Sequence, residues 1–280
     1  MSDEKAIVKV SRFMRSEDTK ARFAEVVGSH NAGAYISSVL LAVASSEQLQ
    51  KCTIESIYIS AMRAATLRLS VDPSTGQAYL VPFGANATLI VGYKGLHDMA
   101  VRTGKYRYIN VGPIFEGETV DPDRISGLIS YDSIGGSKKS DTVIGWLGAF
   151  EMNPERGQKT GYAHTLYMTV DELQAHGKKY SKTYGRKNKD GEHTSKWQTD
   201  PPAMEKKTVL RLLLRRWGYL DPADVQTLDA IDDEPVIVDV DSVMEQTEQE
   251  AKKDEAQLMA ELGYTKEKKA EQPELEPSVG

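Results

Sequence analysis

The sequence predicts an α+β fold in which N-terminal helices precede a mainly antiparallel sheet, C-terminal helices follow it, and an acidic, largely disordered tail comes last. Apolar residues recur at helical spacing up to about residue 68. Short segments rich in β-branched and aromatic residues, separated by polar turns, then extend to residue 169, where helical spacing returns. Because helices and strands occupy separate stretches of the chain, a parallel sheet of alternating strands and helices is not expected.

Three helices are predicted at the start of the domain, after a flexible N-terminal arm of residues 1–15. Ser16 or Asp18 can cap the first helix, because their side-chain oxygens accept hydrogen bonds from free N–H groups of the first turn. Gly28 is a suitable end for that helix, and Thr53 is a suitable N-cap for the third. The predicted helices cover Ser16–Val27, Ala34–Gln50 and Ile54 to about Arg68.

A cluster of turn-forming residues at Asp72–Gly76 marks the change from helices to strands. The first two strands form a hairpin, and Pro82 indicates a sheet edge or a strand end because proline has no N–H to donate. A short helix is predicted from Gly95 to Thr103, and another from Val170 to Tyr180. The predicted strands are Gln77–Phe83, Thr88–Gly92, Tyr106–Phe115, Ile125–Tyr131, Val143–Met152 and Gly161–Thr169.

A basic amphipathic helix is predicted within the stretch Trp197–Gly218, starting at Pro201. Asp200 is a good N-cap, and proline fits the first turn, where its missing N–H has no partner to lose. Lys207, Arg211 and Arg215 recur every four residues and therefore lie along one edge, roughly 6 Å apart. Such a row suits a phosphate backbone, although simple exposure to solvent also explains a basic helix face.

The net charge of −6 conceals a basic body and an acidic tail. Residues 221–280 hold 18 acidic and 5 basic side chains, whereas residues 1–220 hold 23 acidic and 30 basic ones. The basic excess concentrates between residues 178 and 216, where tyrosines and tryptophans are interleaved with the cations. Cations mixed with aromatic rings suit a nucleic acid strand, whose phosphates need counter-charge and whose bases offer faces for stacking.

Length and composition indicate one domain of about 200 residues. We expect residues 16–220 to form a nucleic-acid-binding core and residues 221–280 to form the acidic tail. The single Cys52 allows no intrachain disulfide, and no apolar run approaches the roughly 20 residues of a membrane span. With no hydrophobic signal segment at the N-terminus, the chain is expected in the cytoplasm, without membrane contact.

A search for catalytic motifs gives mostly negative results, so no enzyme activity and no cofactor are expected. The segment from Gly135 to Ser140 resembles a phosphate loop superficially, but it lacks the spacing GxxxxGK[ST] and is flanked by predicted strands. A nucleotide-binding ATPase loop is therefore rejected. The scattered histidines form no metal-binding pair at helical spacing.

One carboxylate cluster remains as an enzymatic alternative. Acidic side chains in this loop could hold Mg²⁺ for a nuclease, but the same residue types are common in solvated turns, which is the favoured interpretation. The cluster consists of Glu116, Glu118, Asp121 and Asp123.

A second group of cations surrounds the short helix after the hairpin. Lys94 lies where a strand gives way to this helix, so the free N–H groups of the helix and the Lys94 ammonium can meet one phosphate. Arg102 lies at the other end of the helix, and Lys105 and Arg107 follow it. Arg102 can equally cap the C-terminal carbonyls of its own helix.

Three segments carry a resemblance to a known family. They are DPSTGQAYLVPF (72–83), LIVGYKGLHDMAVRTGKYRYINV (89–111), and Trp197 with MEKKTVLRLLLRRWG (204–218). Together they closely resemble the RecT family of phage-type single-strand annealing recombinases. The similarity runs in order from about Phe23 to Tyr219, leaving the N-terminal arm and the acidic tail outside the matching core.

The resemblance implies a protein that coats single-stranded DNA, forms homo-oligomeric rings or filaments, and anneals complementary strands without ATP through a duplex intermediate. It also implies a compact α+β domain, a partner 5′-to-3′ exonuclease that supplies the single strand, and a bacterial host. The residues that match the family's basic groove are Lys94, Arg102, Lys206, Lys207 and Arg211, with Lys105, Arg107, Arg215 and Arg216 in more variable positions.

The role of the acidic tail remains open between two hypotheses. A short helix over Glu245–Gly263 could dock a partner, for which a host single-strand binding protein is one candidate. Alternatively the tail solubilises the protein or competes with DNA for the basic groove. For the whole chain the rivals to annealing are the metal-dependent nuclease and a non-catalytic scaffold whose basic surface binds an acidic protein.

Overall fold

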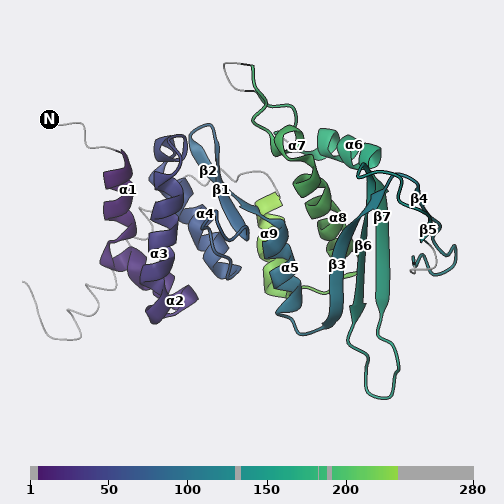
Figure 1. The fold of residues 1–280 in the computed structure, drawn as a ribbon. Helices are drawn as coiled ribbons and strands as arrows, with labels where there is room; N and C mark the ends of the chain where they lie inside the picture. Colours follow the sequence, from purple (N-terminus) through teal and green to yellow (C-terminus); the bar gives the residue numbers. More distant parts are fainter. Residues whose placement is uncertain (1–5, 130–133, 182, 188–190, 233–280) are drawn as a thin grey trace, which may run out of the picture. The chain divides into compact units, whose positions relative to one another are not determined.

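The chain divides into two units, Met1–Pro235 and Val236–Gly280. The computed structural model describes residues 6–129, 134–181, 183–187 and 191–232, all within the first unit (Figure 1). The helix predicted over Glu245–Gly263 lies outside the described residues. The α+β architecture predicted from the sequence is confirmed, with helices first, antiparallel sheets next and helices again after them.

The N-terminal helices form as their caps predict. Ser16, rather than Asp18, caps the second helix by accepting a hydrogen bond from the Thr19 backbone N–H, and Thr53 accepts one from Ser56 in the same way. The elements are α1 (Ala6–Met14), α2 (Glu17–Val27), α3 (Ser29–Ala44), the 3-10 turn η1 (Leu49–Lys51) and α4 (Ile54–Thr66).

Two expectations for this region were wrong. Helix α1 occupies most of the segment expected to be a flexible arm, and it is held because Val10 and Met14 are buried in the core. Helix α3 begins and ends earlier than the predicted Ala34–Gln50. Gly28, with φ of 83°, ends α2 and also stands at the N-cap of α3. Beyond Ala44 the Ser46 hydroxyl accepts a hydrogen bond from the Leu49 N–H and starts a separate turn.

The predicted hairpin is present, and three long strands form a second antiparallel sheet. The hairpin pairs β1 (Ala78–Phe83) with β2 (Asn86–Val91). The second sheet has the order β3-β6-β7. Its strands are β3 (Tyr106–Phe115), β6 (Val143–Met152) and β7 (Ala163–Thr169), and α5 (Tyr93–Val101) connects the hairpin to it.

The strand predicted over Ile125–Tyr131 is wrong for its described part. The Asp123 carboxylate accepts hydrogen bonds from the backbone N–H groups of Ile125 and Ser126, which makes a turn, and the Ile125 side chain is 99% exposed. Tyr131 lies outside the described residues. The small sheet in this region instead pairs β4 (Glu118–Val120) with β5 (Ile134–Gly136).

The C-terminal helices are α6 (Val170–Tyr180), α7 (Lys196–Thr199), α8 (Pro201–Trp217) and α9 (Pro222–Asp232). Of these, α6 and α8 pack on the three-stranded sheet (Figure 1). Helix α8 packs closely on β6 because Gly148 has no side chain, and a Cβ there would lie 2.9 Å from a Val209 methyl group.

Helix α9 lies where the acidic tail was expected to begin. It packs on α4 and β2, and its Asp224 and Leu228 are buried, so the ordered fold continues past residue 220. The core is continuous from Val10 in α1 to Leu228 in α9.

Among the described helices, none is long and apolar enough by itself to cross a membrane. The pair α2 and α3 meets the length and composition requirement only jointly, and it bends by 113° at the break between the two helices.

Candidate nucleic-acid interface

The N-terminus of α5 is fixed against the turn that precedes the hairpin. The Gly92 N–H donates a 2.7 Å hydrogen bond to the Gln77 carbonyl, and a Cβ at Gly95 would lie 2.2 Å from the same oxygen. Glycine at both positions therefore permits the close approach of two backbone segments. The exposed Lys94 extends along Gly76, where a Cβ would lie 3.2 Å from the lysine Cδ.

The Lys94 turn and the basic helix α8 lie together. Helix α5 packs against α8, and the Lys206 ammonium lies 4.4 Å from the centroid of the Tyr93 ring, within range of a cation–π interaction. Tyr93 precedes Lys94 in the chain, and Lys206 precedes Lys207. The Lys94 turn and the row of cations on α8, both recognised in the sequence, therefore meet at this contact.

The row of cations predicted along α8 is present. Burial, together with the nearby Arg211 guanidinium, lowers the pKa of Lys207 to about 7. Burial and the nearby Arg215 lower the pKa of Arg211 to about 10, against an opposing effect of Asp229. The pKa of each of these two cations is therefore lowered by the positive charge four residues further along α8, because residues at this spacing are neighbours on a helix surface. The row is partly buried at Lys207 and Arg211 and exposed at Arg215.

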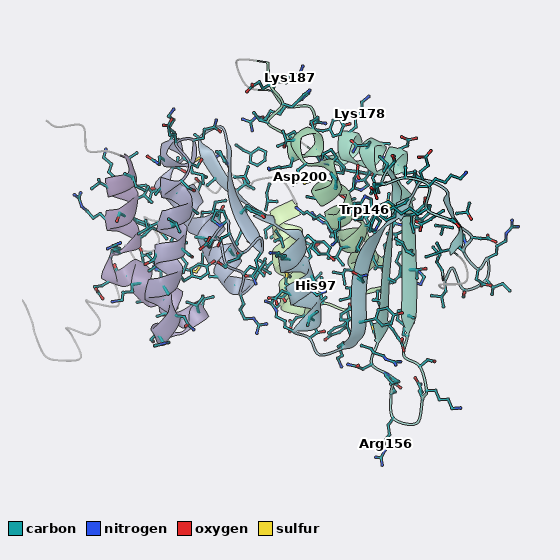
Figure 2. The ribbon with its side chains drawn as sticks, in the orientation of Figure 1. His97, Trp146, Arg156, Lys178, Lys187 and Asp200 are labelled. Carbon is teal, nitrogen blue, oxygen red and sulfur yellow. The ribbon has the colours of Figure 1, made fainter. Side chains whose placement is uncertain are left out.

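A buried carboxylate fixes the rotation of α8. Glu205 is 4% exposed and accepts hydrogen bonds from the Trp146 indole N–H of β6, at 2.9 Å, and from the Gln174 amide of α6, at 2.7 Å. Trp146 and the N-cap Asp200 are labelled in Figure 2. The sequence interpretation missed Glu205, whose position directly before two lysines gave the only signal. Its hydrogen bonds hold Lys206 and Lys207 in place at the start of the row.

Two of the predicted groove arginines pair with carboxylates of α9. Arg102 forms a 2.6 Å ion pair with Asp224, and the two side chains are only 20% and 5% exposed. The Arg102 side chain therefore binds a carboxylate of another helix, rather than capping the C-terminal carbonyls of its own helix α5. Arg215 pairs with Asp229, and both of these side chains are exposed. The first pair anchors α9, while the second lies at the surface beside the basic row.

Comparison with known proteins identifies the family. The family model described as the RecT family matches residues 33–257, which is most of the chain. The chain belongs to the RecT family. It is also 38% identical over 200 residues to the uncharacterized protein YqaK of Bacillus subtilis (strain 168), an alignment that covers 71% of this chain and 63% of YqaK.

The family match extends further than the resemblance predicted. It was expected to end near Tyr219, but it continues to residue 257 and so includes α9 and part of the acidic segment. In this RecT-family chain, α9 with its Asp224 and Asp229 is therefore part of the matching region.

Lys105 and Arg107 are not brought together with Lys94. They follow the C-terminal end of α5, and nine helical residues place about 14 Å between the two ends. The Lys105 ammonium lies 5.7 Å from the Tyr219 ring centroid, and Arg107 forms a 3.0 Å ion pair with Glu151 across β3 and β6.

The carboxylates considered for a nuclease serve local structure instead. Glu118 accepts a hydrogen bond from the Phe115 N–H, and Glu116 accepts one from the Ser140 hydroxyl, each at 2.7 Å. Within the described residues, no group of three His, Cys, Asp or Glu side chains is arranged to hold a metal ion. The glycines at 135 and 136 belong to β5, which pairs with β4, so this segment also lacks the helix that a phosphate loop needs.

Proposed function

We propose that this RecT-family chain binds single-stranded DNA and anneals complementary strands in phage-type homologous recombination. The proposed reaction uses no ATP and makes or breaks no covalent bond. The observation that carries the proposal is the meeting of the Lys94 turn with the α8 row at the Tyr93–Lys206 contact. The proposed DNA-contacting residues at this surface are Lys94, Lys206, Lys207 and Arg211.

The local electrostatics of α5 support an anionic ligand. A helix N-terminus carries partial positive charge, so acidic residues usually occupy the first turn. The first turn of α5 contains no acidic residue and has Lys94 instead. This arrangement is unfavourable in isolation and becomes favourable when a phosphate accepts hydrogen bonds from the helix and from the lysine.

Annealing on such a surface requires no fuel. Cations spaced along α8 would neutralise successive phosphates, which reduces the repulsion between two strands and leaves their bases accessible. Base pairing and stacking, which provide about 1.4 kcal/mol per step, then drive the reaction. Binding to the backbone carries no sequence information, so the activity is expected on any complementary pair.

The wider assignments rest on the family. We propose that the protein forms a homo-oligomeric ring or filament on DNA in the cytoplasm of a bacterial host. A 5′-to-3′ exonuclease would supply its single strand, and the acidic tail from residue 221 would contact a host single-strand binding protein. Because α9 belongs to the fold, the part of this tail that is left for a partner begins after residue 232.

The direct test is annealing of two complementary oligonucleotides of mixed sequence without ATP or divalent metal, followed on a native gel. We expect duplex formation to be faster than in protein-free solution, and no cleavage when Mg²⁺ is added. Cleavage would support a nuclease, and failure to shift either strand at moderate salt would support a scaffold that binds an acidic protein.

A further inference from the structure

Helix α9 brings a carboxylate to the C-terminal end of the α8 row. The Asp229 carboxylate pairs with the Arg215 guanidinium, the last cation of the row, and the two side chains are 46% and 43% exposed. Figure 1 shows α9, in yellow-green, between α4 and α8. The row of cations therefore has an acidic partner at the end where Arg215 lies.

Other residues anchor α9, so Asp229 is held in place. Asp224, five residues earlier, forms the largely buried ion pair with Arg102 at the end of α5. Leu228, which precedes Asp229, is 8% exposed and belongs to the hydrophobic core. Because the backbone of α9 is fixed by these contacts, the Asp229 carboxylate cannot move far from Arg215 when another anion approaches.

The Asp229 carboxylate does not stabilise its own helix. It lies in the last turn of α9, where the helix carries partial negative charge and basic side chains are the stabilising ones, and this turn contains no basic residue. An exposed ion pair also contributes little to the free energy of unfolding. The position of Asp229 is therefore explained by its effect on Arg215 rather than by the stability of the helix or of the fold.

A carboxylate and a phosphate are similar ligands for a guanidinium. Both accept two parallel N–H hydrogen bonds from arginine, and both neutralise its charge. At Arg215 the protein itself thus supplies the kind of anion that a DNA strand would supply. The Arg215–Asp229 pair has no net charge, so a phosphate there would gain little and would lie beside a fixed carboxylate.

The effect of Asp229 is confined to one end of the row. Asp229 acts on Arg211 as well, where it opposes the lowering of the pKa by burial and by Arg215. Lys207 is eight residues from Arg215 along α8, a rise of about 12 Å, which exceeds the screening length of about 10 Å at 0.1 M salt. The positive charge available to a strand therefore decreases from Lys207 toward Arg215.

We propose that Asp229 takes the place of a phosphate at Arg215, so that a DNA strand contacts Lys207 and Arg211 on α8 and leaves the helix before Arg215. This inference rests on the proposed DNA-binding function. It removes Arg215 from the DNA contacts that the sequence predicts. Asp229 then determines affinity, because it limits the number of phosphates that α8 holds.

The test measures oligo-dT binding by the full chain as a function of salt concentration. Asp229→Asn removes the charge and keeps the shape of the side chain, whereas Asp229→Glu keeps the charge. Arg215→Ala removes the cation, and a fourth variant combines Asp229→Asn with Arg215→Ala. The matched controls are Asp18→Asn and Arg22→Ala on the exposed face of α2, which also carries Lys20.

Asp229→Asn should increase the slope of log affinity against log salt by about 0.7, because Arg215 gains one phosphate. Since this gain disappears at 1 M salt, it amounts to about fivefold in affinity at 0.1 M. Arg215→Ala should leave the slope within about 0.3 of that of the unmodified protein, and the combined variant should show no increase. Asp229→Glu and both controls should match the unmodified protein.

A decrease of about 0.7 in the slope of Arg215→Ala would show that the strand already contacts Arg215, which overturns the inference. Equal gains for Asp229→Asn with and without Arg215, or for Asp229→Asn and Asp18→Asn, would assign the effect to overall charge and overturn it as well. A tighter complex with Asp229→Glu would assign it to the packing of α9, with the same consequence. If the unmodified protein does not bind oligo-dT, the proposed function itself fails, which is a different outcome from failure at Asp229 alone.

Discussion

Lys207 gives the clearest chemical signature of the proposed surface. Burial and the neighbouring Arg211 lower its pKa to about 7, so the free protein carries a partial charge there near neutral pH. A bound phosphate favours the charged ammonium and raises this pKa, which couples DNA binding to uptake of a proton.

Single-strand affinity is therefore predicted to fall as the pH rises. Below pH 7 Lys207 is charged before and after binding, so its effect on affinity is constant. Above pH 7 the free protein loses the proton that the complex retains, and affinity falls by up to about tenfold per pH unit until the pKa of the complex is reached. Fluorescence anisotropy with labelled oligo-dT from pH 6.5 to 8.5 measures the effect.

Arginine substitutions provide the control, because a guanidinium stays charged throughout this range. Lys207→Arg should flatten the pH dependence, whereas Lys206→Arg should leave it unchanged. The pKa of His176 is lowered by burial and by nearby cations, which moves its titration away from the measured range rather than into it. An unaltered pH dependence in Lys207→Arg would show that Lys207 does not contact DNA.

The ion pairs of α9 predict two different stability effects. Asp224→Asn leaves the largely buried Arg102 without its carboxylate, at a cost of about 3 kcal/mol in the free energy of unfolding. Asp229→Asn breaks an exposed pair and should cost less than about 1 kcal/mol. Urea unfolding of both variants measures the difference, and equal effects would contradict a structural role for Arg102.

The sequence could predict which cations line up along one edge of a helix, but not which of them form ion pairs with carboxylates. The spacing of Lys207, Arg211 and Arg215 follows from helix geometry and was recoverable from sequence alone. The partner of Arg102 is 122 residues away, so its structural role depends on tertiary packing that no local pattern indicates.

At the scale of elements, the docking of α5 determines where Lys94 lies. Alanine normally stabilises a helix relative to glycine by about 1 kcal/mol. At Gly95 the same substitution should destabilise the protein instead. The added Cβ would lie 2.2 Å from the Gln77 carbonyl oxygen and would push α5 away from the turn.

We predict that Gly95→Ala destabilises the fold by about 1–3 kcal/mol and weakens oligo-dT binding through displacement of Lys94. Gly33→Ala is the matched control, because Gly33 lies in α3 with nothing within 4 Å of its added Cβ, and it should be neutral or stabilising. Thermal unfolding and anisotropy report the two effects. Equal melting temperatures for the two variants would argue against the close docking.

Elements with strong local signals were predictable, and those held by distant contacts were not. The caps at Thr53, Thr169 and Asp200 were recognised because the hydrogen bond of an N-cap involves residues two or three positions away. Helix α9 was assigned to a tail because its sequence is acidic, and its order depends on contacts with α4 and β2. The predicted strand at Ile125 had suitable residue types but no neighbouring strand to pair with in the described part of the chain.

At the scale of the whole molecule, the net charge of −6 would exclude a nucleic acid partner if charge were uniformly distributed. Separation of a basic body from an acidic C-terminal segment removes this objection, and the sequence alone shows it. The meeting of α5 with α8 required the structure, because the sheet strands β3, β6 and β7 intervene between them in the chain.

The salt dependence of oligo-dT binding tests the central claim most directly. Each cation that contacts a phosphate contributes about 0.7 to the slope of log affinity against log salt for single strands. At pH 6.5, where Lys207 is mostly charged, Lys207→Ala with Arg211→Ala should weaken binding and reduce the slope by about 1.4, while Lys20→Ala with Arg22→Ala changes neither. An unchanged affinity and slope in the α8 variant would contradict the proposal that this helix holds the DNA strand.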